Sequence, residues 1–95
     1  MPNKKSILFD LGQVVATPGA LRAFEEAKVA PITLLGRHVT GDWGEVPPED
    51  AEENELSVRE GYRILSSYTL PTKERIWIIT EADRSATTFL LPSEY

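Results

Sequence analysis

The chain contains no cysteine, a single histidine and no long apolar run. Without cysteine, a disulfide framework, a thiolate nucleophile and a thiolate zinc site are all excluded. The longest apolar stretches, such as IWII at 76–79, are far below the roughly 20 residues that a membrane helix requires. The segment MPNKKSILFDLG is interrupted by Asp10 and has no small-residue cleavage site, so we expect no signal peptide and a cytoplasmic location.

Several catalytic signatures are also missing. The sequence has no Gly-rich phosphate loop, no G-x-S-x-G, no H-E-x-x-H and no paired Ser/His pattern that would indicate a nucleophile. One histidine and one aspartate make at most half of a coordination shell. We therefore predict no metal site and no cofactor.

The composition is that of an ordinary globular domain. Of the 95 residues, 41% are hydrophobic and 26% are charged, which is close to the average and argues against disorder or a fibrous structure. A chain this short has too little surface to bury for two separate cores. We therefore expect a single domain over residues 1–95.

Acidic residues outnumber basic ones by 15 to 10, which gives a net charge of −5. An acidic surface repels phosphate backbones, so direct binding of nucleic acid is disfavoured. The acids are unevenly placed, because seven of them lie between Glu45 and Glu60, where Arg59 is the one basic residue. This block is either a solvated helix face or a surface directed at a basic partner.

The first part of the chain predicts short strands and then a helix. Apolar runs at 7–11 and 13–16 suit one or two short strands. Thr17 and Pro18 mark a helix start, because threonine can accept from free amides and proline is preset for the first helical position. The apolar spacing that follows predicts a helix over 18–28.

Two more helices are predicted by the same kind of signal. Pro31 opens the second, and Gly41 should end it by allowing a left-handed turn. The acids after Pro48 suit the positive end of a third helix dipole, and Gly61 should end that helix. Leu56, with Ala51 or Val58, should form its buried side.

The period of the apolar pattern changes to two after residue 61. Alternation predicts strands over 64–70, 75–80 and 85–91, joined by short turns at PTKE and EADR. Strands joined in this way form an antiparallel meander. The tail PSEY is a cap or a fourth short edge. The expected fold is α+β, with two or three helices packed on one face of a three- to four-stranded antiparallel sheet.

The segment HVTGDWG at 38–44 carries the one histidine and one of the two tryptophans. Asp42 could orient the ring of His38, as an acid does for a catalytic histidine. Alternatively, His38 is half-exposed at a helix end and Asp42 accepts hydrogen bonds from amides of the loop. Trp43 is either a lid on the core or an exposed stacking platform and interface anchor.

A second polar cluster is the stretch TEADRSATT. Arg84 in a turn beside hydroxyls could clamp a phosphate or a carboxylate. It could equally pair with Glu81 or Asp83 within the same turn. Thr87 and Thr88 should point to opposite faces of the last strand.

The stretches FDLGQVVATPGAL, RHVTGDWG and WIITEADRSATTFLLPSEY resemble a family of small bacterial proteins found on plasmids and other mobile elements. Its members are often labelled "plasmid-related protein" or "type I restriction endonuclease subunit M". The likeness covers most of the chain and is least distinctive in the acidic helix. The chain is far too short for a methyltransferase domain. The resemblance implies a mobile-element setting, in which small proteins act as toxins, antitoxins or inhibitors of host restriction and CRISPR systems.

The expected layout is also similar to that of small metal-independent RNases of the barnase, RelE and colicin D type, at the level of the fold. This likeness implies a toxin in which His38, with Asp42, acts as acid or base. Arg84 would hold the scissile phosphate, and Thr87 or Thr88 would donate to it. Such RNases are usually basic, whereas this chain is acidic.

Two functional hypotheses follow. In the first, which we favour, the protein is no enzyme and binds a host or element-encoded protein, for which a basic nucleic-acid-binding surface is a suitable target. In the second, it is the RNase-like toxin. Pairing of edge strands between two copies would make a homodimer. The binding residues of the first hypothesis are Trp43, Glu45, Glu49, Asp50, Glu52 and Glu53.

Overall fold

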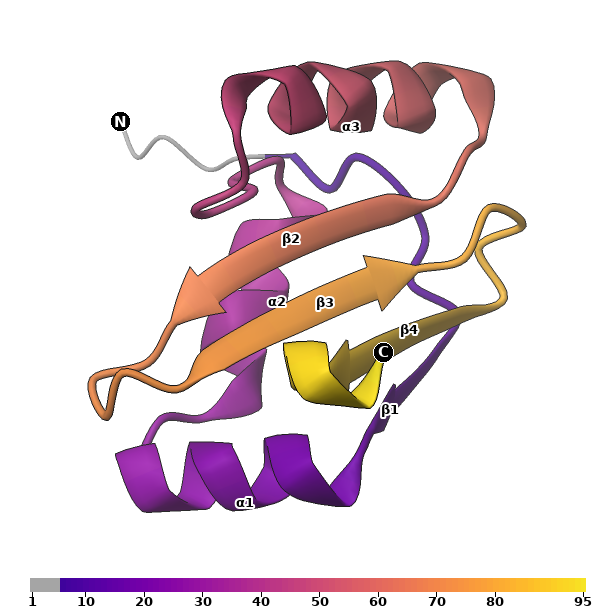
Figure 1. The fold of residues 1–95 in the computed structure, drawn as a ribbon. Coiled ribbons are helices and arrows are strands. Elements are labelled where there is room, and N and C mark those ends of the chain that lie inside the picture. Colours follow the sequence, from indigo (N-terminus) through magenta and orange to yellow (C-terminus); the bar gives the residue numbers. More distant parts are fainter. Residues whose placement is uncertain (1–5) are drawn as a thin grey trace, which may run out of the picture.

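A computed structural model describes residues 6–95 of the chain (Figure 1). The three helices are α1 (Pro18–Ala27), α2 (Pro31–Val39) and α3 (Pro48–Glu60). The four strands are β1 (Gln13–Ala16), β2 (Ile64–Thr69), β3 (Arg75–Thr80) and β4 (Ala86–Leu90), and a short 3-10 helix, η1 (Pro92–Glu94), follows them. The predicted α+β class is confirmed.

The four strands form one sheet in the order β1-β4-β3-β2. The antiparallel meander of β2, β3 and β4 is as predicted. However, β1 runs parallel to β4, so the sheet is mixed and the prediction of a purely antiparallel sheet was wrong in this respect. The physical reason is that periodicity identifies an extended segment but carries no information about the strand with which it pairs. The apolar run at 7–11 forms no strand.

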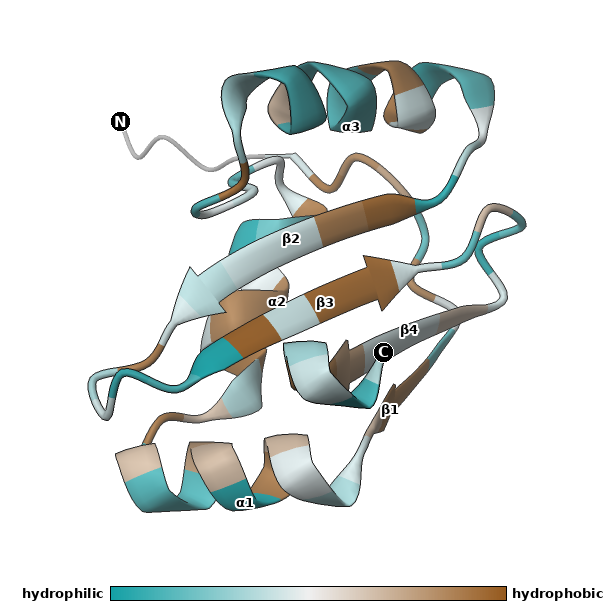
Figure 2. Ribbon diagram, viewed as in Figure 1, coloured by the Kyte–Doolittle hydropathy of each residue, from teal (hydrophilic) through white to brown (hydrophobic). Residues whose placement is uncertain are grey.

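The helices are unequally distributed around the sheet. In Figure 1, α2 lies behind β2 and β3, α1 lies at the margin formed by β1, and η1 lies in front. α3 runs beside β2, at the opposite margin of the sheet from β1. Figure 2 shows α3 as the most hydrophilic of the helices, with hydrophobic residues concentrated on the strands and on α2.

The core has two parts. The larger part lies between α1, α2 and the sheet, and comprises Ala20, Ala23, Phe24, Leu34, Leu35, Tyr68, Leu70, Ile76, Ile78 and Phe89. The smaller part adjoins α3, and comprises Phe9, Val39, Trp43 and Ile64. The large strand residues of these two clusters (Ile64, Tyr68, Ile76, Ile78 and Phe89) lie at alternate positions, so they share one face of the sheet. Ile79 and Leu90 are buried on the other face.

The helix ends follow the sequence signals closely. The Thr17 side chain accepts a hydrogen bond from the Ala20 amide at 3.1 Å and caps α1. α1 ends at Ala27, one residue earlier than predicted, because Lys28 takes the left-handed C-cap position with φ 58°. Gly61, with φ 81°, caps α3 as predicted, since glycine adopts this conformation without strain.

α3 is attached to the sheet through both polar and apolar side chains. Its buried residues are Asn54 and Ser57. The predicted buried side, Leu56 with Ala51 or Val58, is only partly covered, and Ala51 and Val58 pack against the smaller part of the core. The Asn54 amide group donates to the Leu65 carbonyl at 2.8 Å and accepts from the Leu65 amide at 3.2 Å. Asn54 thereby takes the place of a neighbouring strand along the outer edge of β2.

The loop before α3 covers the rest of that edge. Glu45 donates its amide to the Ser67 carbonyl at 2.7 Å, and the Ser67 amide donates to the Trp43 carbonyl at 3.1 Å. Gly44 forms the bridge between these bonds with φ 75°, and a β-carbon added there would lie 2.0 Å from the Ser67 carbonyl oxygen. The outer edge of β2 is therefore occupied from Leu65 to Ser67.

Candidate functional site

The HVTGDWG segment ends α2 and turns toward the edge of β2. Arg37 and Asp42 form a forked ion pair, with Nε to Oδ2 at 2.7 Å and Nη2 to Oδ1 at 3.2 Å. The hydrogen bond to Asp42 raises the pKa of Arg37. Asp42 Oδ1 also accepts from the Gly44 amide at 3.2 Å, as the loop interpretation predicted. The carboxylate therefore shapes this turn.

His38 is completely buried, although both interpretations of it required access to solvent. Its Nδ1 lies 2.5 Å from the Ser66 hydroxyl on β2, and its Nε2 lies 2.9 Å from the Thr80 hydroxyl on β3. Both ring nitrogens are thus engaged by strand hydroxyls, which leaves neither of them to be oriented by Asp42. The catalytic-pair geometry expected for this segment is not formed.

The hydroxyl chain beyond His38 determines its tautomer. The Thr87 hydroxyl donates to the Leu11 carbonyl at 2.7 Å, so its one proton is used. The bond between Thr80 and Thr87, at 2.8 Å, must then be donated by Thr80. With the Thr80 proton used in turn, His38 Nε2 must carry the proton, and Nδ1 accepts from Ser66. A neutral histidine satisfies this network completely.

Burial also holds His38 in the neutral state. Loss of hydration penalises the charged ring and lowers the pKa of His38 from 6.5 to about 3. A group that is neutral near pH 7 and sealed from solvent can neither donate a proton to a substrate nor take one from it. His38 instead links α2, three strands and the Leu11 segment through one chain of hydrogen bonds.

Trp43 is a lid on the core. It is 6% exposed, and its indole Nε1 donates to Glu55 of α3 at 3.0 Å. Its ring stacks on Phe9 with centroids 6.3 Å apart and meets the edge of His38 at 6.0 Å. Trp43 was predicted to bind a partner under the first hypothesis, but its burial withholds the ring from any partner at the surface.

Arg84 is neither a free clamp nor half of an ion pair with Glu81 or Asp83. Its guanidinium donates to four backbone carbonyls at 2.8–3.2 Å, those of Ser57, Tyr62, Glu81 and Ala82. Its Cζ also lies 5.5 Å from the centre of the Phe9 ring. Arg84 therefore ties the β3–β4 turn to the C-terminal end of α3. The sequence did not signal this, because backbone carbonyls are not visible as partners in a sequence.

The residues proposed for catalysis do not meet in one accessible pocket. The Phe9 ring lies between His38 and Arg84, with its centroid 5.3 Å from that of His38. Thr87 is fully buried in the His38 chain, while Thr88 lies on the opposite face, as predicted for alternate positions. A phosphate at the surface cannot contact His38. The geometry therefore gives the RNase-like hypothesis no support.

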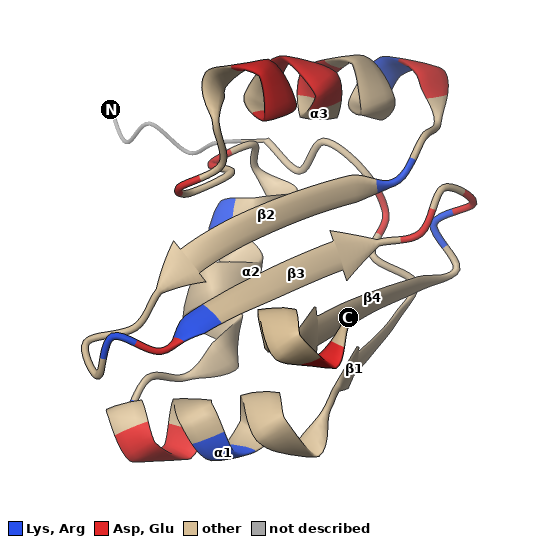
Figure 3. Ribbon diagram, in the orientation of Figure 1, with Lys and Arg blue, Asp and Glu red and all other residues tan. Residues whose placement is uncertain are grey.

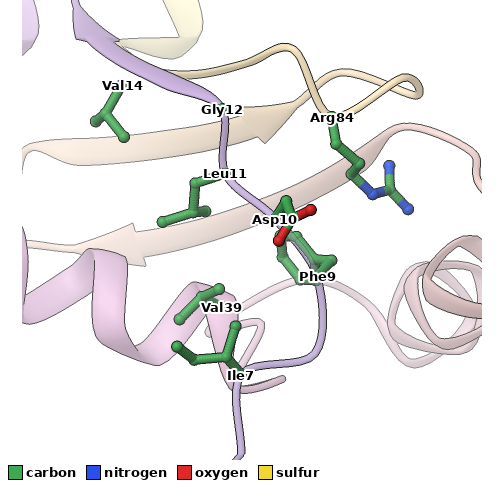
Figure 4. A pocket seen from close by; sticks show the side chains of 8 residues that line it. All are labelled: Ile7, Phe9, Asp10, Leu11, Gly12, Val14, Val39 and Arg84. Carbon is green, nitrogen blue, oxygen red and sulfur yellow. The ribbon is translucent and has the colours of Figure 1, made fainter.

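A hollow of about 580 Å³ lies beside the segment 7–12. Its lining is mainly apolar and consists of Ile7, Phe9, Asp10, Leu11, Gly12, Val14, Val39 and Arg84 (Figure 4). Within residues 6–95, no group of three or more acidic or histidine side chains is placed to hold a metal ion. No helix in this part of the chain is long and apolar enough to cross a membrane.

The acidic residues gather on α3, as Figure 3 shows. Two acids of the block are engaged in the fold: Glu55 accepts from the Trp43 indole, and Glu45 lies 2.6 Å from the Thr69 hydroxyl and 3.4 Å from Arg75. The others are exposed, and no hydrogen bond or ion pair among residues 6–95 engages their side chains. They are Glu49, Asp50, Glu52, Glu53 and Glu60.

The sequence interpretation missed the partners of His38. Ser66, Thr80 and Thr87 occupy the same alternate positions as buried core residues such as Ile64, so the period-two pattern already places them inside. Three inward hydroxyls need partners, and the chain has one histidine to supply both a donor and an acceptor. Counting these hydrogen-bond donors and acceptors could have predicted the network.

Comparison with protein-family models, with curated proteins and with solved structures yields no significant match to this chain.

Proposed function

We propose that the protein is a small acidic accessory protein of mobile genetic elements that acts by binding another protein. The target in this proposal is a basic nucleic-acid-binding surface. Components of a host restriction or CRISPR system, or the toxin of a toxin–antitoxin pair, carry surfaces of this kind. The sequence resemblance supports the mobile-element setting, and the charge distribution on α3 supports the electrostatic mode of binding.

The observation that carries the proposal is the row of carboxylates on α3 that no hydrogen bond or ion pair within residues 6–95 engages. The helix is held to the sheet by Asn54 and Ser57, and its cap is Gly61. None of these attachments uses an exposed acid, so the fold can form without the row. Like charges this close repel one another, and a cationic partner would relieve that repulsion.

The structure narrows the residues expected to make the contact. Trp43 is buried and Glu45 is engaged with Thr69 and Arg75. Neither is therefore expected to contact the partner, although the sequence had suggested both. The remaining contact residues are Glu49, Asp50, Glu52 and Glu53, and Glu60 joins them on the exposed side of the helix. Charges at the rim of such an interface mainly accelerate association and make it sensitive to salt.

Two adjacent glutamate pairs provide a matched test. Glu52→Lys with Glu53→Lys reverses two charges on α3, and Glu25→Lys with Glu26→Lys reverses two on α1, where both residues are also exposed. The net charge of the protein changes by the same amount in both variants. Each variant and the wild type would be used to capture proteins from a bacterial host that carries restriction and CRISPR systems, at low and high salt.

The expected result is one basic protein that binds the wild type and the α1 variant, is lost from the α3 variant, and dissociates as salt rises. A second measurement is the plating efficiency of unmodified phage on a restricting host that expresses each variant. If the amount of captured protein changes neither with salt concentration nor with the charge reversal on α3, the electrostatic proposal is refuted. Equal loss in the α1 variant would assign the effect to net charge instead of to α3.

A further inference from the structure

The two edges of the sheet differ in a way that identifies a second interaction surface. The outer edge of β2 is occupied by Asn54 and the 43–45 loop. The outer edge of β1 has no such cover: in the described chain, no hydrogen bond reaches its outward backbone groups from outside the sheet. An uncovered strand edge is a template for another strand.

The hydrogen bonds of β1 to β4 show which groups face outward. The amides of Gln13 and Thr17 donate to the carbonyls of Ser85 and Phe89. Alternate residues point the other way in a strand, so the amides and carbonyls of Val14 and Ala16 lie on the free edge. Val14 and Val15 are 42% and 41% exposed, which is unusual for valines within a sheet.

The chemistry of this edge suits a second copy of the same chain. From Leu11 to Leu21 no residue is charged, and natural edges are commonly protected by lysine, proline or a bulge. Residues 11–21 therefore bring no charged side chain of their own to a contact between two molecules of net charge −5. The Glu94 carboxylate lies at the end of this stretch, where it accepts from the Thr17 hydroxyl. A basic partner of the α3 face would gain nothing from a neutral edge.

We propose that β1 pairs antiparallel with β1 of a second copy around a two-fold axis through Val15. In this register Val14 of each copy faces Ala16 of the other, and both amide–carbonyl pairs are satisfied on each side. The two Val15 side chains then meet on the same face of a continuous eight-stranded sheet, since each copy contributes four strands.

The apolar hollow adjoins this edge. Val14 forms part of its wall together with Ile7, Phe9 and Leu11 (Figure 4). In the proposed register Ala16 of the partner copy lies beside Val14 on this face. Because alanine is small, the partner strand can lie next to the hollow without a steric clash. The α3 helices remain at the far margins of the double sheet, so the pairing is independent of the function proposed above.

Cysteine cross-linking tests the register, because the wild type has no cysteine. Val15→Cys would place two thiols opposite each other at a Cα separation of about 4.5 Å, which a disulfide can span. Gln13→Cys lies on the same face of the same strand, but its two copies would be about 14 Å apart in this register. Under mild oxidation we expect the Val15→Cys dimer to form at least about tenfold faster.

Sedimentation of the protein without cysteine supplies the second readout. The wild type should become dimeric as its concentration rises, and Val14→Pro should remain monomeric, because proline removes an outward donor and breaks no bond to β4. Reversal of Glu52 and Glu53 should leave the dimer intact. Equal cross-linking of the two cysteine variants, a wild type that is monomeric up to its solubility limit, or a dimer that survives Val14→Pro would each overturn the proposal.

Discussion

Acidification from pH 7 to pH 5 should destabilise this protein through its single histidine. His38 is buried in the neutral form, and its pKa is lowered to about 3. In the unfolded chain a histidine has a pKa of about 6.5 and takes up a proton in this range. Between about pH 6.5 and pH 3 the unfolded state therefore binds more protons than the folded state, and stability falls as the pH falls.

The size of the effect follows from the two pKa values. At pH 5 the folded His38 remains neutral, while almost every unfolded molecule is protonated at this site. The free energy of unfolding should then be lower by about 2 kcal/mol than at pH 7. For a domain of this length the total stability is about 5–14 kcal/mol, so the loss is readily measurable. Above pH 7 this group contributes no further pH dependence.

Urea denaturation at pH 5, 6 and 7 measures this effect, and His38→Gln is the matched control. Glutamine offers one donor and one acceptor near the Ser66 and Thr80 hydroxyls but does not titrate. The variant should be less stable throughout, because its side chain is shaped differently, and its stability should be nearly flat between pH 7 and pH 5. The carboxylates are common to both proteins, so they cancel in the comparison.

NMR provides the direct test of the underlying state. The imidazole C–H resonances of the folded wild type should stay at the neutral positions down to pH 4, and the spectrum should correspond to the tautomer protonated at Nε2. A folded-state titration with a midpoint near pH 6.5 would refute the buried neutral histidine, and with it the assignment of the hydroxyl chain.

Three further substitutions probe the contacts that hold the sheet, each measured by chemical denaturation. Arg84→Met should cost about 2–4 kcal/mol, because four backbone carbonyls lose the guanidinium and only two of them, Ser57 and Glu81, keep a backbone amide as donor; a cost near zero would show that water replaces the guanidinium fully. Asn54→Ala should cost about 1–3 kcal/mol and accelerate hydrogen exchange at the Leu65 amide, which would be left without its acceptor. Gly44→Ala should cost at least about 2 kcal/mol, since its φ is 75° and the new β-carbon would clash with the Ser67 carbonyl; an unchanged midpoint would refute the close approach.

Much of the secondary structure could be predicted from local signals. Pro18, Pro31 and Pro48 each begin a helix, and α3 ends at Glu60 before Gly61 as expected. The strand at 75–80 has the predicted bounds. These features depend on backbone preferences and on the alternation of side chains, both of which are properties of neighbouring residues.

The candidate site was much less predictable. The HVTGDWG segment was correctly expected to end a helix, and Asp42 does bind within its loop. The burial of His38 was not expected, because a histidine near a helix end is usually accessible. It depends on Ser66 and Thr80, which lie 28 and 42 residues further along the chain.

The sequence by itself determined the α+β class, the order of the elements, the acidic block and the absence of thiol chemistry, since these depend on composition and on local spacing. The tertiary structure alone decided that β1 joins β4 in parallel, that Arg84 donates to backbone carbonyls, and that residues 6–95 cover one edge of the sheet and leave the other open. The physical reason is that the partner of a buried polar group is chosen by packing across the chain. Local pattern shows that such a group needs a partner, and the fold determines which one it finds.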